Sequence, residues 1–79
     1  MPRYYFHLLN DVDVPDEEGK ELPDLEAARE QARFNVRFTA GETLKEEGRI
    51  SLGHRIEIED AGGTVLDTVY FGDVLQIDD

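Results

Sequence analysis

The chain has 79 residues, no cysteine, and 19 acidic against 8 basic residues, which gives a formal net charge of −11. This acidity disfavours nucleic acid and anionic membranes as partners, because phosphate groups would meet repulsion over most of the surface. Without cysteine there is no disulfide framework, and two histidines are too few to suggest a structural zinc site. The length fits one domain spanning residues 1–79.

The apolar residues make up 39% of the chain and recur in periodic segments, so we expect a folded core rather than disorder. A domain of this size buries only about 60% of its unfolded surface, and such domains often gain stability by self-association. No signal peptide is recognisable, and no apolar run approaches the roughly 18 residues of a membrane span. We therefore expect a cytoplasmic protein.

The first third of the chain predicts two strands joined by an acidic loop. Residues 3–9 are rich in aromatic side chains and lack glycine and proline, which favours a strand. Its better core face carries Tyr4, Phe6 and Leu8. Residues 10–19 form a turn-rich loop in which Gly19 can adopt a positive φ, and residues 20–22 are expected to pair back on the first strand.

Residues 24–47 have the features of one long helix. Asp24 is a suitable N-cap, Lys45 suits the negative end of the helix dipole, and Gly48 stands where a C-terminal glycine is common. The stretch before Gly41 has low helix propensity, so a bend or break near Gly41 is one expectation.

The last third of the chain predicts a hairpin and a packed tail. Residues 54–60 alternate cleanly, with both isoleucines facing inward. Residues 60–63 are a hairpin turn signal, and residues 64–71 return as the partner strand. The tail, residues 72–79, still carries apolar side chains and is expected to pack. The pattern predicts an α+β fold of order β-β-α-β-β, in which one long helix lies across one face of a small antiparallel sheet of about four strands.

The predicted helix has a stripe of mostly small residues and, opposite it, two phenylalanines. The stripe comprises Leu25, Ala28, Ala32, Val36, Thr39 and Thr43. Phe34 and Phe38 are spaced i, i+4 and form a pair. One interpretation is a partner surface, most simply a homodimer contact. The alternatives are that the pair itself is the core face, or that residues 74–77 cover it.

Three arginines, Arg29, Arg33 and Arg37, follow one another at i, i+4 and form a basic ridge on the helix. The ridge could contact a phosphate group or an acidic partner. The alternative, which such surface patterns favour, is that the arginines pair with Glu26, Glu30 and the acidic loop of the same chain.

No pattern in the sequence predicts catalysis, a metal or a cofactor. The acidic loop departs from the calcium-binding EF-hand because Pro15 takes a ligand position and Asp16 the place of the glycine. His7 and His54 could form an acid–base pair only if the fold brought them together. No nucleophile motif surrounds Ser51. We therefore expect a solvated acidic loop and a protein without enzymatic activity.

The chain resembles a family of small bacterial domains of unknown function. The resemblance rests on the opening residues 2–8, on the Asp-Glu-Glu-Gly motif of residues 16–19 and on residues 21–29, Glu-Leu-Pro-Asp-Leu-Glu-Ala-Ala-Arg. A later strand resembling residues 55–58, with its Asp-x-x-Gly turn, completes it. The resemblance implies a shared architecture and no activity.

Two hypotheses of function follow. The first is a small acidic interaction module without catalysis that forms a homo-oligomer, most simply a dimer, or binds another protein. The second is an antitoxin-like or inhibitor-like protein that presents its acidic surface to a basic partner. A weak resemblance of residues 22–25, Leu-Pro-Asp-Leu, to the antitoxin partners of some bacterial toxin pairs accompanies the second hypothesis.

Overall fold

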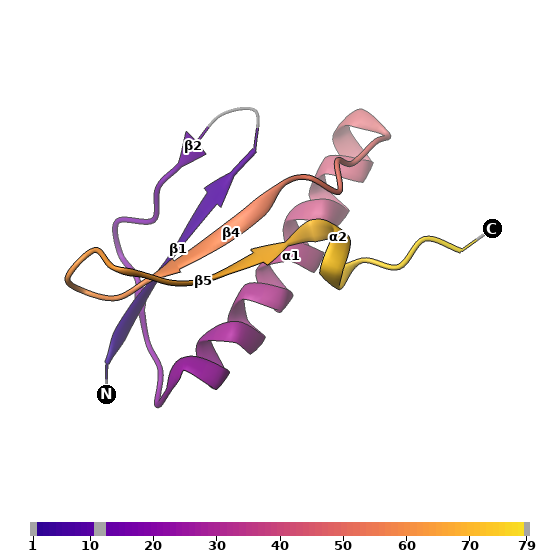
Figure 1. Cartoon of the computed structure of the whole chain (residues 1–79). Helices are drawn as coiled ribbons and strands as arrows, with labels where there is room; N and C mark the ends of the chain where they lie inside the picture. Colours follow the sequence, from indigo (N-terminus) through magenta and orange to yellow (C-terminus); the bar gives the residue numbers. More distant parts are fainter. Residues whose placement is uncertain (1, 11–12, 79) are drawn as a thin grey trace.

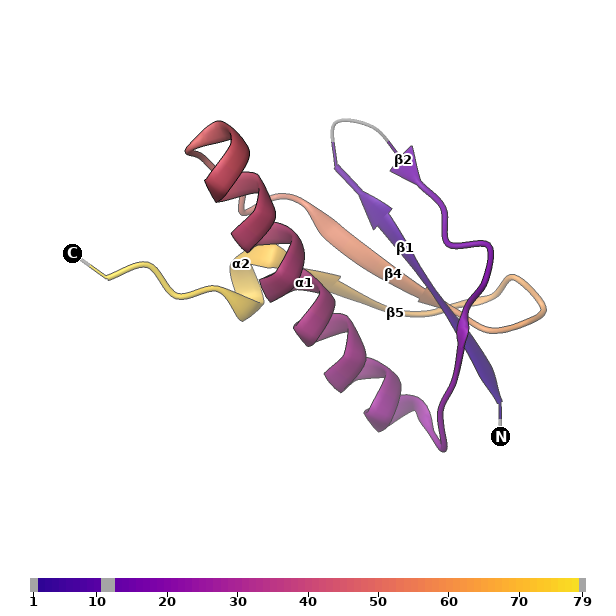
Figure 2. The same cartoon turned by 180° about the vertical axis from the view of Figure 1, so that it is seen from behind.

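The computed structural model describes residues 2–10 and 13–78. Its elements are β1 (Arg3–Leu9), β2 (Asp13–Val14), β3 (Lys20–Glu21), α1 (Leu25–Glu47), β4 (Arg55–Glu59), β5 (Val65–Tyr70) and α2 (Phe71–Val74). The sheet is antiparallel with strand order β2-β1-β4-β5, and β3 also pairs with β1. Helix α1 lies across one face of this sheet (Figures 1 and 2).

This architecture confirms the predicted α+β class with one long helix on one sheet face. The observed order is β-β-β-α-β-β, because the predicted loop contains the two-residue strand β2, which pairs with the end of β1. Strand β3 lies within the predicted second strand and pairs with the beginning of β1, as expected.

The ends of α1 are capped by the two residues that the sequence indicated. The Asp24 side chain accepts a hydrogen bond from the backbone N–H of Ala27 at 2.8 Å. Gly48 has φ of 71° and donates its N–H to the carbonyl oxygen of Leu44 at 3.0 Å. The sequence left a bend or break near Gly41 open, and the structure shows no break, because the helix runs without interruption through this residue for its full 23 residues.

The core forms between the small-residue stripe of α1 and the facing side of the sheet. The buried helix residues are Ala28, Ala32, Val36 and Ala40. Ile56 and Ile58 of β4 face them and are buried, and Tyr4 of β1 joins the same cluster. Because three of these four buried helix residues are alanine, the helix backbone can approach the sheet closely. The prediction that the small residues face inward is confirmed.

Strand β5 ends one residue earlier than predicted. Phe71 opens the short helix α2, is only 2% exposed and donates its backbone N–H to the carbonyl oxygen of His54 at 2.8 Å. Burial of this ring against the core explains why the chain turns here instead of continuing as a strand. In the tail, Val74 and Leu75 pack against the core as expected, whereas Ile77 is 66% exposed.

The sheet face opposite α1 is covered by no helix of the described residues (Figure 1). None of the helices in residues 2–10 and 13–78 combines the length and apolar character needed to cross a membrane.

Candidate functional site

The most unusual surface feature is the phenylalanine pair on the side of α1 that faces away from the sheet. The side chains of Phe34 and Phe38 are 58% and 63% exposed. Their ring centroids lie 6.4 Å apart and the ring planes are inclined by 24°, so the rings stack on each other. Neither alternative from the sequence holds within this chain. The pair is not the core face, and residues 74–77 leave it exposed.

The pair lies in the middle of a stripe that we call the outer face. At 100° per residue, the helix positions within about 60° of the direction opposite the core belong to it. They are Ala27, Glu30, Gln31, Phe34, Arg37, Phe38, Gly41 and Lys45. Glu30 therefore lies on the N-terminal side of the aromatic pair, Arg37 lies between its two residues in the chain, and Lys45 lies on its C-terminal side.

The three arginines of the basic ridge have different contacts. Arg29 donates from Nε to Oδ2 of Asp67 on β5 at 2.7 Å, and its Nη1 lies 3.3 Å from Oε2 of Glu26. Arg33 pairs with Glu30. Arg37 is exposed and makes no ion pair within residues 2–10 and 13–78.

The predicted pairing of the ridge with its own helix is confirmed for Glu26 and Glu30. The predicted pairing with the acidic loop is wrong for residues 13–18, because the partner from outside the helix is Asp67. The hydrogen bond from Arg29 and the backbone N–H of Thr68 lower the pKa of Asp67. The same ion pair raises the pKa of Arg29. This contact ties α1 to the sheet, so Arg29 serves the fold.

The conformation of the acidic loop is fixed by hydrogen bonds to Asp16. The Asp16 carboxylate accepts hydrogen bonds from three backbone N–H groups at 3.1 Å each, those of Phe6, Glu18 and Gly19. Burial raises the pKa of this carboxyl, but the three backbone hydrogen bonds outweigh it, so the pKa is lowered overall. Asp11 lies outside the described residues. Among the described residues no group of three or more His, Cys, Asp or Glu side chains is placed to hold a metal ion.

The two histidines have different surroundings. His7 accepts a hydrogen bond at Nδ1 from the backbone N–H of Asp16 at 2.9 Å, and its Nε2 lies 3.3 Å from the Glu59 carboxylate. His54 meets the ring of Phe71 edge-on, with centroids 5.7 Å apart. These contacts belong to separate parts of the fold, so they do not join the two imidazoles in one acid–base site.

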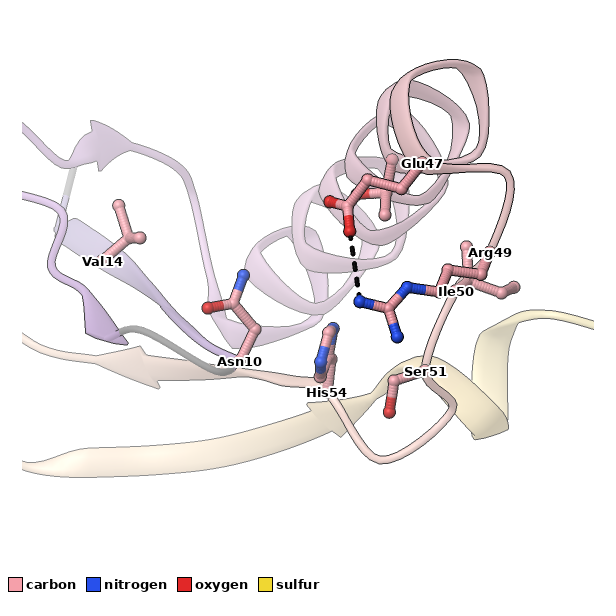
Figure 3. Close-up of a pocket in the computed structure, with 8 residues that line it drawn as sticks. Asn10, Val14, Glu47, Arg49, Ile50, Ser51 and His54 are labelled. Carbon is pink, nitrogen blue, oxygen red and sulfur yellow. Dashed lines mark ion pairs between the residues drawn. The ribbon is translucent and has the colours of Figure 1, made fainter.

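A pocket of about 460 Å³ opens near the C-terminal end of α1. Its lining comprises Asn10, Val14, Thr43, Glu47, Arg49, Ile50, Ser51 and His54 (Figure 3). The Arg49 guanidinium points toward the Glu47 carboxylate, with an Nη2–Oε1 distance of 3.6 Å. The Ser51 hydroxyl accepts a hydrogen bond from the backbone N–H of Gly53 at 3.3 Å and so stabilises the turn before β4. The described lining residues do not follow the strand–loop–helix order of a phosphate-binding motif.

Sequence reasoning missed two features of these surfaces. Asp67 was not recognised as the partner of Arg29, which is 38 residues away in the chain. Its place two residues before Val69 in an alternating strand was the available signal, because these two positions lie opposite Ile58 and Ile56 on the sheet face that α1 covers. The pocket was also missed, since it joins the end of α1 to the beginning of β4 and to Asn10.

Comparison with known proteins gives a family and no activity. A family model described as a domain of unknown function, DUF6894, matches residues 3–72. No curated protein matches the chain. No solved structure matches it either. The family match confirms the resemblance to a domain of unknown function that the opening residues and the residues before α1 indicated.

Proposed function

Since the chain belongs to DUF6894, a family of unknown function, we propose from its structure that it is a small interaction module that self-associates through the outer face of α1 and has no catalytic activity. The observation that carries this proposal is the exposure of the stacked Phe34–Phe38 pair. Isolated apolar residues are common on protein surfaces, but adjacent large aromatic rings are enriched where proteins meet.

The energetic gain from covering the pair is substantial for so small a domain. Burying a fully exposed phenylalanine side chain contributes about 1.5–3 kcal/mol, and Phe34 and Phe38, at 58% and 63% exposure, would each contribute part of this in both copies. Aromatic anchors near the centre of an interface typically dominate the affinity. Among residues 2–10 and 13–78 of one copy, only eight hydrophobic residues are buried. A domain with so small a core gains stability when a second copy binds its folded state.

The net charge of the chain favours self-association through an apolar contact over self-association through a charged one. The net charge of −11 makes two copies repel each other at long range, and salt screens this repulsion. An interface centred on aromatic rings keeps its driving force at high salt. We therefore expect self-association to persist at about 0.5 M salt, where the Debye length is only a few ångströms.

The test is the mass of the protein in solution, measured by sedimentation equilibrium and by size exclusion with light scattering. The wild-type chain should be a dimer, and Phe34→Glu or Phe38→Glu should be a monomer with an unchanged circular dichroism spectrum. Ile77→Glu is the matched control, because its side chain is 66% exposed but lies in the tail; this variant should remain a dimer. A monomeric wild-type chain at several hundred micromolar would overturn the proposal.

The second candidate function is an antitoxin-like or inhibitor-like protein that binds a basic partner. The observation that favours it is the excess of acids. Five bases already pair with acids of the same chain, namely Arg3, Arg29, Arg33, Lys45 and Arg49, out of eight bases against 19 acids. A pull-down at low and at high salt separates the two functions, because a basic partner should be lost at high salt while the self-associated form is retained.

A further inference from the structure

The imidazole of His7 joins β1 to the acidic loop. The segment between β2 and β3 runs beside β1 (Figures 1 and 2). Within this segment the backbone N–H of Asp16 donates a hydrogen bond to Nδ1 of His7 at 2.9 Å. A ring nitrogen accepts a hydrogen bond only while it carries no proton, so the imidazole in this contact is neutral and has its proton on Nε2. This tautomer also suits Glu59, whose carboxylate oxygen lies 3.3 Å from Nε2.

A proton added to Nδ1 of His7 removes the acceptor of this hydrogen bond. An imidazolium ring has an N–H group on each nitrogen and no acceptor, so the backbone N–H of Asp16 would face a second donor at 2.9 Å. The hydrogen bond is then lost and the two groups must separate. Histidine is the side chain whose charge ordinarily changes between pH 8 and pH 5.

Two carboxylates of β4 hold the charged ring in place. Phe6 packs against the core, so His7, the next residue of β1, lies on the sheet face opposite α1. On that face it is directly across from Glu57, and Glu59 is two residues further along β4. Both carboxylates attract an imidazolium, and the contact with Glu59 becomes a charge-assisted hydrogen bond when the ring gains a proton. The ring therefore stays on β4, and the loop backbone is the part that moves.

The other charged and titratable groups near His7 keep their charge state between pH 8 and pH 5.5. Arg55 of β4 stays a cation. The β5 residue opposite this part of β4 is the uncharged Thr68. Tyr5 precedes His7 on the same face of β1, and phenols are neutral in this range. The Asp16 carboxylate interacts with the ring through its charge, and its pKa lies below the ordinary 3.8, so it stays ionised.

We propose that His7 is a pH-sensitive switch that controls the attachment of the acidic loop to β1. The neutral imidazole accepts the hydrogen bond of Asp16 and holds the loop, whereas the imidazolium binds the glutamates of β4 and releases the Asp16 backbone. The contact between the Asp16 carboxylate and the N–H of Phe6 remains, so the change is a local loosening without unfolding. Residues 16–18 are all acidic, so acidification changes how the chain presents its negative charge. This inference is independent of the proposed self-association.

The test is amide hydrogen exchange measured by NMR at pH 8 and pH 5.5, with each rate expressed relative to an unstructured chain at the same pH. The protection of the Asp16 amide should fall about fivefold at the lower pH, which is the effect of losing one hydrogen bond of ordinary strength. The amide of the buried Ile58 should retain its protection, because the fold persists. The ring nitrogen signals of His7 should show the Nε2–H tautomer at pH 8 and the imidazolium at pH 5.5.

Three variants separate the His7 imidazole from other causes. His7→Asn places a carbonyl oxygen near the position of Nδ1 but takes up no proton, so the Asp16 amide should be equally protected at both pH values. His7→Phe removes the acceptor, and protection should be low at both. His54→Gln removes the other histidine and should keep the wild-type response.

Three results would each overturn the inference. The first is an Asp16 amide whose protection stays constant while the His7 ring gains its proton. The second is a His7 ring that is still neutral at pH 5.5. The third is a fall in Asp16 protection that persists in His7→Asn, since another group would then cause it.

Discussion

The backbone N–H of Asp16 donates a hydrogen bond to Nδ1 of His7 at 2.9 Å, and the Asp16 carboxylate accepts one from the backbone N–H of Phe6, the residue before His7, at 3.1 Å. The loop residue is thus bonded to β1 through two successive residues. The other carboxylate oxygen accepts from Glu18 and Gly19 and closes the turn that follows. One aspartate therefore fixes both the position and the shape of the acidic loop.

Removing this side chain should destabilise the fold measurably. Asp16→Ala leaves three backbone N–H groups without their acceptor, and we expect the free energy of unfolding to fall by about 2 kcal/mol. Asp16→Asn keeps one carbonyl oxygen as an acceptor and should lose less. The measurement is urea unfolding followed by circular dichroism. Equal stability of Asp16→Ala and the wild type would show that the loop bonds to β1 are not maintained in solution.

The same carboxylate, together with Asp67, should make the protein sensitive to acid. The backbone hydrogen bonds of Asp16 and the Arg29 contact of Asp67 hold both pKa values below the ordinary 3.8. A carboxyl with a lowered folded-state pKa stabilises the fold above its unfolded-state pKa, and this contribution is lost as the pH falls through the folded-state pKa. The free energy of unfolding should therefore decline below about pH 4.

Variants assign this acid sensitivity to the two aspartates. Asp16→Asn and Asp67→Asn should each flatten the decline between about pH 4 and pH 2. Glu17→Gln is a neighbouring substitution that removes none of the hydrogen bonds of Asp16, and it should keep the wild-type slope. An unchanged slope in both asparagine variants would mean that other groups cause acid unfolding.

The parts of the fold that depend on neighbours in sequence were predictable. Strand β1 has the predicted bounds because aromatic residues without glycine or proline favour a strand. The caps at Asp24 and Gly48 are local signals, and each satisfies helix-end groups that have no other partner. Periodicity also placed Phe34 and Phe38 opposite the small-residue stripe, but it left open whether the pair was exposed, formed the core face or was covered by residues 74–77, and the structure shows both rings exposed.

The features that escaped prediction depend on contacts between distant segments. The two-residue strand β2 is defined by its pairing with the end of β1, in which Val14 lies opposite Leu8. The turn into α2 depends on Phe71 filling the core and on the hydrogen bond from Gly72 N–H to the Leu52 carbonyl oxygen, at 3.0 Å. The Arg29–Asp67 pair joins helix and sheet across 38 residues. No pattern within a short window specifies such pairs.

Substitutions at Gly19 and Gly63 separate the cost of a positive φ from the cost of a steric clash. Both have positive φ, 69° and 85°. A Cβ at Gly19 would lie 2.9 Å from three atoms, the Arg3 Cγ, the Tyr4 carbonyl oxygen and the Tyr5 Cε2, whereas at Gly63 it would meet nothing within 4 Å. Gly63→Ala should cost about 1 kcal/mol from the left-handed conformation alone.

Gly19→Ala adds a steric clash to the same conformational strain, so it should cost at least about 3 kcal/mol, or prevent folding. Thermal unfolding of the two variants side by side makes the comparison. If both alanine variants lose the same stability, the close approach of Gly19 to β1 is not present in solution.

Gly41 and Gly48 provide the corresponding test on α1, and the two substitutions should act in opposite directions. On a Phe34→Glu background, which the proposed function expects to be monomeric, Gly41→Ala should raise the free energy of unfolding by about 0.8–1 kcal/mol, since it improves helix propensity and its Cβ meets nothing within 4 Å. Gly48→Ala should lower it by about 1 kcal/mol, because alanine is strained at φ of 71°. If the wild-type chain self-associates through the outer face of α1 as proposed, the added methyl group of Gly41→Ala should also weaken the dimer, because Gly41 lies on that face. Chemical denaturation at two protein concentrations measures both quantities, and a Gly41→Ala variant that is more stable as a monomer but associates as tightly as the wild type would place the contact away from Gly41.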